Sequence, residues 1–201
     1  MKQLVSILIP AYNAEAWIAD TIRSAITQTW PRKEIIVVDD GSTDQTLAVA
    51  RRFASKEIAV IVEGNSRYHP KNQGASAARN HALSLSQGDY IQWLDADDLL
   101  SPDKIASQIG GIEEVPKQSN TVLVGMGLLR VPDRAGMRTA TWLVSRELTD
   151  ATGPWDNRLF VDDDGEYFCR AIVASDGIRF IPEAKVLYRV TPSSRLSYIG
   201  R

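Results

Sequence analysis

Three carboxylates stand within four residues near the middle of the chain. Asp95, Asp97 and Asp98 directly follow Tyr90–Leu94, an apolar run with the length of a buried strand. Carboxylates this close repel one another, and those at a strand end can converge on Mg²⁺ or Mn²⁺, which prefer oxygen ligands and also bind substrate phosphates. Asp-x-Asp alone is a weak motif, and the alternative is an acidic loop that caps a helix beginning near Ser101.

A second pair of carboxylates, Asp39 and Asp40, follows the apolar run Glu34–Val38. We favour a binding role for Asp39, which could accept a hydrogen bond from the imide N–H of a base or from a ribose hydroxyl. For Asp40 we favour a plain turn, because Asp and Gly are turn residues. Ser42, with Gln45 three residues later, is predicted to cap the next helix.

The first apolar run of the chain ends in a turn with the residues to hold a nucleoside. Tyr12 offers an aromatic face to a base, beside the strand-ending backbone of Pro10 and Ala11. Asn13 is expected to cap a helix over residues 14–28. A turn followed by a helix cap accounts for Pro10 and Asn13 without any binding role, but it does not explain Tyr12.

A helix rich in small residues is predicted to follow Asn72 and Gly74 and to end at Gly88. Small side chains allow close packing of a helix on a sheet. Arg79 is the exception, and we expect it either to reach a diphosphate or to pair with Asp95.

A further acidic cluster, Asp162, Asp163, Asp164 and Glu166, opens a predicted helix. Favourable interaction with the helix dipole explains one or two of these carboxylates. The functional interpretation is a general base that deprotonates an acceptor hydroxyl, because crowded like charges raise the pKa of one of the group.

The elements around these residues alternate between strand and helix in the first part of the chain. Strands are predicted at residues 4–9, 34–38, 58–62, 90–94 and 121–124. Such alternation predicts βαβ units, hence an α/β fold with a doubly wound, mostly parallel sheet and helices on both faces. Ligands of these sheets bind outside the carboxyl ends of the strands, where the residues above would line one crevice. After Gly125 we predict a strand at 139–144, a helix at 164–174 and a strand at 184–189.

Composition limits the classes of partner. With 201 residues, 44% hydrophobic residues and a net charge of −2, the chain suits one globular domain. It lacks the clustered basic excess of nucleic-acid-binding proteins, and no stretch approaches the roughly 18 apolar residues that a membrane span needs. The single cysteine, Cys169, allows no internal disulfide, which favours a cytoplasmic location.

Together these motifs resemble family 2 glycosyltransferases, which have the GT-A fold. The resemblance rests on residues 5–13, 37–44, 72–74, 78–80 and 93–98, with a weaker match over 139–190 where Asp163 replaces the usual Glu of a Glu-Asp pair. It implies a nucleotide site that includes Pro10, Ala11, Tyr12, Asn13, Asp39, Asn72, Gly74, Arg79, Asp95 and Ala96. It also implies Mn²⁺ or Mg²⁺ bound at Asp97, and a catalytic pair formed by Asp163 and Asp164.

The implied reaction is an inverting transfer of a sugar from a UDP-linked or similar donor to a hydroxyl of a carbohydrate or other acceptor. The acceptor could be membrane-associated, which would place the protein at the inner face of the membrane. Residues 1–100 would form the nucleotide-sugar half of a single domain, and residues 101–201 the acceptor half, shortened at 125–138. That shortening, and a chain that stops at Arg201, keep open a nucleotide-binding module with little transfer. A nucleotidyltransferase is disfavoured, because its glycine-rich phosphate loop is missing near Pro10.

Overall fold

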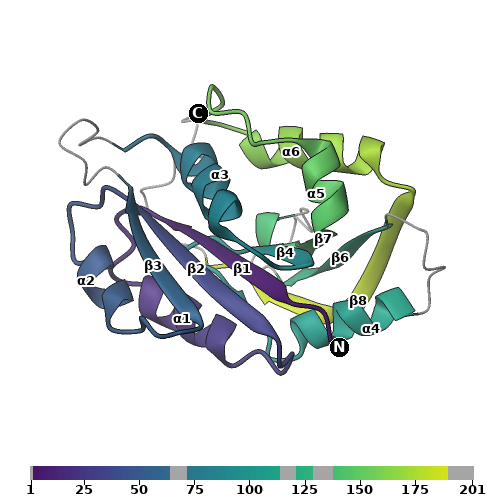
Figure 1. Ribbon diagram of the computed structural model, residues 1–201, viewed down its shortest axis with the longest axis horizontal. Helices are drawn as coiled ribbons and strands as arrows, with labels where there is room; N and C mark the ends of the chain where they lie inside the picture. Colours follow the sequence, from purple (N-terminus) through teal and green to yellow (C-terminus); the bar gives the residue numbers. More distant parts are fainter. Residues whose placement is uncertain (1, 64–71, 114–120, 129–137, 190–201) are drawn as a thin grey trace.

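The computed structural model describes residues 2–63, 72–113, 121–128 and 138–189 (Figure 1). Their strands form one eight-stranded sheet in the order β3-β2-β1-β4-β7-β6-β8-β5. The strands are β1 (Val5–Ala11), β2 (Lys33–Asp40), β3 (Ile58–Glu63), β4 (Tyr90–Trp93), β5 (Leu99–Leu100), β6 (Thr121–Leu128), β7 (Trp142–Ser145) and β8 (Gly177–Leu187). The helices are α1 (Ile18–Ile26), α2 (Thr46–Arg51), α3 (Ala75–Leu85), α4 (Lys104–Glu113), the 3₁₀ turn η1 (Thr139–Thr141), α5 (Arg146–Thr152) and α6 (Asp163–Ala174).

The first half of the sheet has the predicted parallel arrangement. β1 pairs in parallel with β2 and β4, and β2 pairs in parallel with β3. Every residue of β1 is buried, as expected for a central strand covered on both faces. The carboxyl ends of β1, β2 and β4 therefore lie at the same edge of the sheet.

The second half of the sheet departs from the predicted doubly wound pattern. β7 runs antiparallel to both β4 and β6, and β5 runs antiparallel to β8, while β6 and β8 are parallel. The predicted strand at 139–144 begins instead with η1 and becomes extended only at Trp142. Alternating burial reveals a strand but not its direction, because side chains alternate with the same period in both kinds of sheet.

The helices cover both faces of the sheet, which confirms the expected layering (Figure 1). One apolar cluster lies between the sheet and α1, α2 and α4, and includes Ile7, Ile22 and Ile105. The cluster on the other face packs against α3, α5 and α6, and is rich in aromatic residues such as Trp93 and Trp155. β1 contributes Val5, Ile7, Ile9 and Ala11 to the first cluster and Leu8 to the second, so one strand supports both cores.

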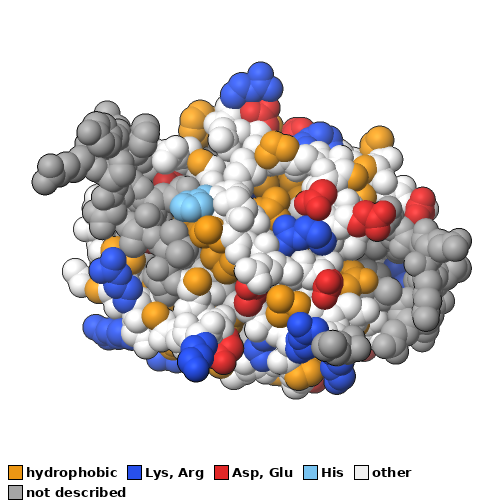
Figure 2. All heavy atoms as spheres, viewed as in Figure 1, with side chains coloured by type: hydrophobic (Ala, Val, Ile, Leu, Met, Phe, Trp, Pro, Cys, Tyr) orange, Lys and Arg blue, Asp and Glu red, His pale blue; other side chains and the backbone are white. Residues whose placement is uncertain are grey.

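The outer surface carries charges of both signs. On the face drawn in Figure 2, the described Lys and Arg side chains are interspersed with Asp and Glu. Among the described residues, none of the helices is both long and apolar enough to cross a bilayer.

Candidate functional site

The turns after β1 and β2 are linked to each other by side-chain hydrogen bonds. Ala11, the last residue of β1, lies beside Asp39 of β2. The Asn13 Oδ1 atom accepts the Thr43 N–H at 2.9 Å, and the Asn13 N–H donates to Ser42 Oγ at 3.0 Å. The prediction that Asn13 caps α1 was therefore wrong, because its side chain serves this long-range contact. The Tyr12 side chain is left 46% exposed above the turn.

The start of α2 also differs from the capping box predicted for Ser42 and Gln45. The helix begins at Thr46, whose N–H donates to the Asp44 carboxylate at 2.9 Å. The Ser42 hydroxyl is already used by Asn13. The turns after β1 and β2 are thus joined by hydrogen bonds at the carboxyl edge of the sheet.

Asp39 and Asp40 separate into two roles. The Asp39 side chain is buried, and its Oδ2 accepts the Ser42 N–H at 3.2 Å. Its Oδ1 has no hydrogen-bond partner within the described part of the chain. A buried oxygen without a donor is costly, so this atom suits a ligand N–H or O–H. Asp40, the last residue of β2, instead accepts the N–H groups of Gln73 and Gly74, which is a long-range structural contact in place of the local turn predicted for it.

Gly74 sets the direction in which α3 leaves this edge. Its φ of +97° is strained for any residue with a Cβ. The Gly74 N–H also donates to Asn72 Oδ1 at 2.9 Å. Both predicted nucleotide residues of this segment therefore lie at the amino end of α3, beside Asp40.

Arg79 joins the two halves of the chain at one buried point. Its guanidinium donates to Asp95 Oδ1 at 2.9 Å and to Asp163 Oδ2 at 2.5 Å. It also lies over the ring of Trp155, with its central carbon 4.3 Å from the ring centroid. The pairing with Asp95 confirms one of the two alternatives predicted for Arg79. Asp163 is held further by the Ser76 hydroxyl at 3.2 Å, so it is engaged in anchoring α6.

The acidic loop after β4 is fixed through its backbone. The Thr21 hydroxyl of α1 donates to the carbonyls of Ala96 and Asp98, at 2.8 and 3.0 Å. Asp97 is half-buried in this loop. The described residues contain no group of three His, Cys, Asp or Glu side chains placed to hold a metal, so the expected convergence of several carboxylates is not seen. A single carboxylate still fits Mn²⁺ or Mg²⁺, which complete their shells with waters and phosphate oxygens.

Asp164 has the electrostatic surroundings of a general base. Burial, and then the neighbouring Asp95 and Asp163 carboxylates, raise the pKa of Asp164 above its ordinary value. The Gly165 N–H at 2.9 Å and the charge of Arg79 oppose this rise. Its Oδ2 faces the Thr139 hydroxyl at 3.5 Å. A carboxylate with a raised pKa holds a proton more readily at working pH, which a general base requires.

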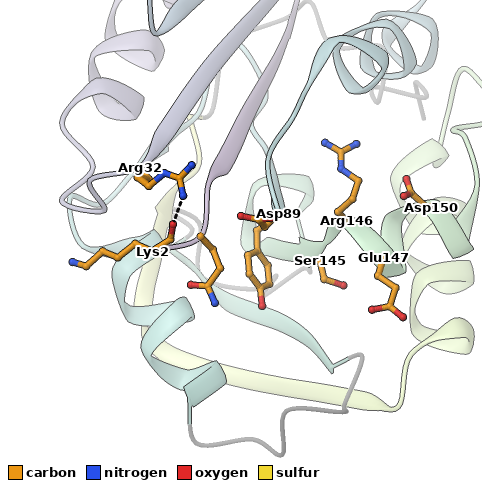
Figure 3. A pocket seen from close by; sticks show the side chains of 9 residues that line it. Lys2, Arg32, Asp89, Ser145, Arg146, Glu147 and Asp150 are labelled. Carbon is orange, nitrogen blue, oxygen red and sulfur yellow. Dashed lines mark hydrogen bonds between the residues drawn. The ribbon is translucent and has the colours of Figure 1, made fainter.

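A large open cavity of about 760 Å³ lies elsewhere, at the amino ends of β1 and β4 (Figure 3). Lys2 and Arg32 approach it from one side, and Arg146, Glu147 and Asp150 from the other. Some of its polar groups hold the chain together, as where Arg146 donates to the carbonyl oxygens of Ser86 and Gly88 and Asp89 accepts the Leu4 N–H. We therefore take the carboxyl edge, where the unsatisfied Asp39 oxygen and Asp164 lie, as the candidate functional site.

Sequence reasoning did not identify three residues that support this site. Trp155, Ser76 and Thr21 contact Arg79, Asp163 and the acidic loop through bonds between distant segments. The proposed shortening at 125–138 lies mostly outside the described residues.

Comparison with known proteins gives a consistent match. Residues 6–127 match the family described as glycosyl transferase family 2. The UDP-Glc:alpha-D-GlcNAc-diphosphoundecaprenol beta-1,3-glucosyltransferase WfaP of Escherichia coli is 40% identical over 111 residues, which are 55% of this chain and 42% of that protein. The first curated relatives are likewise covered over 41% of their length, so the chain spans about two fifths of these proteins.

Two solved structures share the fold. TarS of S. aureus in complex with UDP-GlcNAc aligns with a TM-score of 0.81 at 21% identity, over 96% of this chain and 60% of that one. The mannosyltransferase PcManGT of Pyrobaculum calidifontis, in complex with GDP-Man and Mn²⁺, aligns with a TM-score of 0.74 at 20% identity, over 96% and 58%. At these identities the likeness establishes the fold, and it confirms the expected GT-A arrangement.

Proposed function

The chain belongs to glycosyl transferase family 2, and we propose that it transfers a sugar, with inversion, from a nucleoside-diphosphate sugar to an acceptor hydroxyl. The observation that carries this proposal is the buried Arg79. By binding Asp95 and Asp163 together, it brings the nucleotide-side motifs and the helix that bears Asp164 to one place. A site for donor binding and a base for the acceptor thereby become neighbours.

The donor nucleotide is held at the turns after β1, β2 and β4. The free Oδ1 of Asp39 accepts a hydrogen bond from the base or ribose, and the exposed Tyr12 ring covers the base. Asp95, oriented by Arg79, contacts the ribose. Pro10, Ala11, Asn13, Asn72, Gly74 and Ala96 supply the backbone around it. UDP is our first choice of nucleotide, because the names of WfaP and of the TarS complex include UDP-sugars.

Asp97 is the residue assigned to a divalent ion, Mn²⁺ or Mg²⁺. Support comes from its place in a backbone-fixed acidic loop and from the Mn²⁺ in the PcManGT complex. When bound, such an ion supplies positive charge against the diphosphate leaving group.

Asp164 takes the proton from the acceptor hydroxyl. As that oxygen forms its bond to the anomeric carbon, the bond from this carbon to the diphosphate oxygen breaks, and the nucleoside diphosphate leaves with the electron pair. One direct displacement inverts the anomeric centre. Asp163 acts as a positioning residue, since Arg79 and Ser76 already occupy its carboxylate.

The acceptor is a hydroxyl compound, carbohydrate or otherwise. We place its site beside α6, in the half formed by residues 101–201 of the single domain. A cytoplasmic location, with access to acceptors at the inner membrane face, is part of the proposal.

A product assay tests the transfer. In the presence of Mn²⁺ we expect the chain to transfer the sugar of a UDP-sugar to a hydroxyl acceptor or to water and to release UDP. Asp164→Asn should stop this release without weakening UDP binding. UDP binding without any turnover in the unaltered chain would instead support a nucleotide-binding module. Equal release by Asp164→Asn would show that Asp164 is not the base.

A further inference from the structure

The loop from Asp95 to Asp98 is held from two sides. On one side, Thr21 of α1 donates to the carbonyl oxygens of Ala96 and Asp98. The carbonyl between them, that of Asp97, accepts from Arg189 Nε at 3.2 Å. Three successive carbonyl groups thus face donors from distant segments, with the single Thr21 proton shared between two of them, and these contacts restrict the backbone that carries the Asp97 side chain.

Arg189 contacts this loop at a second point and is itself anchored. Its backbone N–H donates to Asp98 Oδ1 at 3.2 Å. Its guanidinium lies over the Trp17 ring, with the central carbon 4.5 Å from the ring centroid, and its Nη2 is 3.7 Å from Asp20 Oδ2. The Arg189 side chain is only 27% exposed. It thus spans from the chain after β8 to the acidic loop and to α1.

These contacts need the shape of arginine. A guanidinium is planar, so one face can stack on Trp17 while its edge donates to the Asp97 carbonyl and faces the Asp20 carboxylate. A lysine ammonium keeps the charge but is a point donor on a flexible stem. Loss of the edge donor would remove the hydrogen bond to the Asp97 carbonyl oxygen, while Thr21 would still hold the neighbouring Ala96 and Asp98 carbonyls.

We propose that Arg189 is a positioning residue for Asp97, and that it holds the acidic loop in the arrangement that binds a divalent ion with the donor diphosphate. The inference rests on the proposed function, because it concerns the ion assigned to Asp97. It predicts that Arg189 acts on the metal-dependent part of nucleotide binding and leaves the base- and ribose-binding contacts of Asp39 unchanged.

The test measures UDP affinity by calorimetry, with Mn²⁺ and with EDTA, in the full chain and in three variants. Residues that orient metal ligands typically change metal affinity by about 10–100-fold. For Arg189→Met, which keeps the aliphatic stem, we expect UDP affinity to fall about tenfold with Mn²⁺ and to change less than about twofold with EDTA. Arg189→Lys should fold even if Arg189→Met does not, and should show a smaller loss in the same direction.

Arg23→Met is the matched control. Arg23 lies on α1 and pairs with the same Asp20, at 2.9 Å, but it is 61% exposed and is not bonded to the loop. We expect it to leave UDP affinity unchanged under both conditions, with a thermal melt confirming that all variants are folded. The inference is overturned if Mn²⁺ strengthens UDP binding by the Arg189 variants as much as by the unaltered chain, or if these variants lose UDP affinity equally with EDTA. It is also overturned if Arg23→Met loses as much UDP affinity as they do. Failure of the unaltered chain to bind UDP at all would instead contradict the proposed function.

Discussion

Replacing Arg79 by Met removes a cation that Asp95 and Asp163 share. The guanidinium is buried, and the two carboxylate side chains are 31% and 20% exposed. Removing one partner of a buried ion pair costs about 3–5 kcal/mol, since the other charge stays behind without compensation. Because water can reach both carboxylates in part, we place Arg79→Met near the lower limit, at about 3 kcal/mol of unfolding free energy.

The same substitution should shift the pH dependence of catalysis. Arg79 is one of the groups that lower the pKa of Asp164, so its loss raises that pKa further. The reaction needs the carboxylate form, and its rate rises with pH as Asp164 loses its proton. The acid limb of the rate profile should therefore move to higher pH in Arg79→Met. Arg79→Lys keeps a charge and should show a smaller displacement.

Urea unfolding followed by tryptophan fluorescence measures the loss of unfolding free energy. Nucleotide release from a UDP-sugar between pH 4 and pH 8 measures the shift of the acid limb. Arg146→Met is the control, because that guanidinium also binds inside the fold, to the carbonyls of Ser86 and Gly88, but at the opposite edge. It should lower stability without moving the acid limb. An acid limb that stays in place in folded Arg79→Met, or unchanged stability, would refute the reasoning.

Three further predictions concern single positions. Asp164→Asn should lower kcat at least about 100-fold and raise the melting temperature at pH 7, because burial and the neighbouring carboxylates disfavour the charged Asp164 in the folded state. The rise in melting temperature should vanish below the ordinary pKa of Asp164, because there the residue is neutral in both the folded and the unfolded state. Calorimetry across pH measures this. Asp97→Ala should bind UDP equally well with Mn²⁺ and with EDTA in a titration. Gly88→Ala would place a Cβ 2.6 Å from the Ser6 backbone nitrogen, and we expect it to lower the free energy of unfolding by about 3 kcal/mol. A Cβ at Gly110 meets nothing within 4 Å, so Gly110→Ala should raise that free energy by about 0.5–1 kcal/mol. Urea unfolding measures both.

The sequence predicted the parallel half of the sheet well because its signals are local. A buried strand such as β1 is recognisable as a short apolar run in the sequence. The polar residues that follow such a run lie at the carboxyl edge of the sheet. Local rules failed where a side chain has a distant partner. Asn13 looks like a helix cap but binds Thr43, 30 residues away. Gly88 looked like a helix end, yet its small size serves a close approach to Ser6.

The candidate site was predictable in part for the same reason. The link from Arg79 to Asp95 could be expected from one helix and one strand end, only 16 residues apart. Its second partner, Asp163, is 84 residues away and gives no periodic signal. The contacts of Arg189 with the acidic loop span over 90 residues and become apparent only when β8 is placed beside β5.

The claim that the carboxyl edge binds a nucleoside diphosphate with a divalent ion is tested most directly by titrating the chain with UDP, GDP and dTDP. Each titration is run with Mn²⁺ and again with EDTA. We predict that UDP binds, and that Mn²⁺ strengthens its binding through Asp97. If none of the three nucleotides binds in the presence of Mn²⁺, the assignment of this edge as a nucleotide-sugar site is wrong.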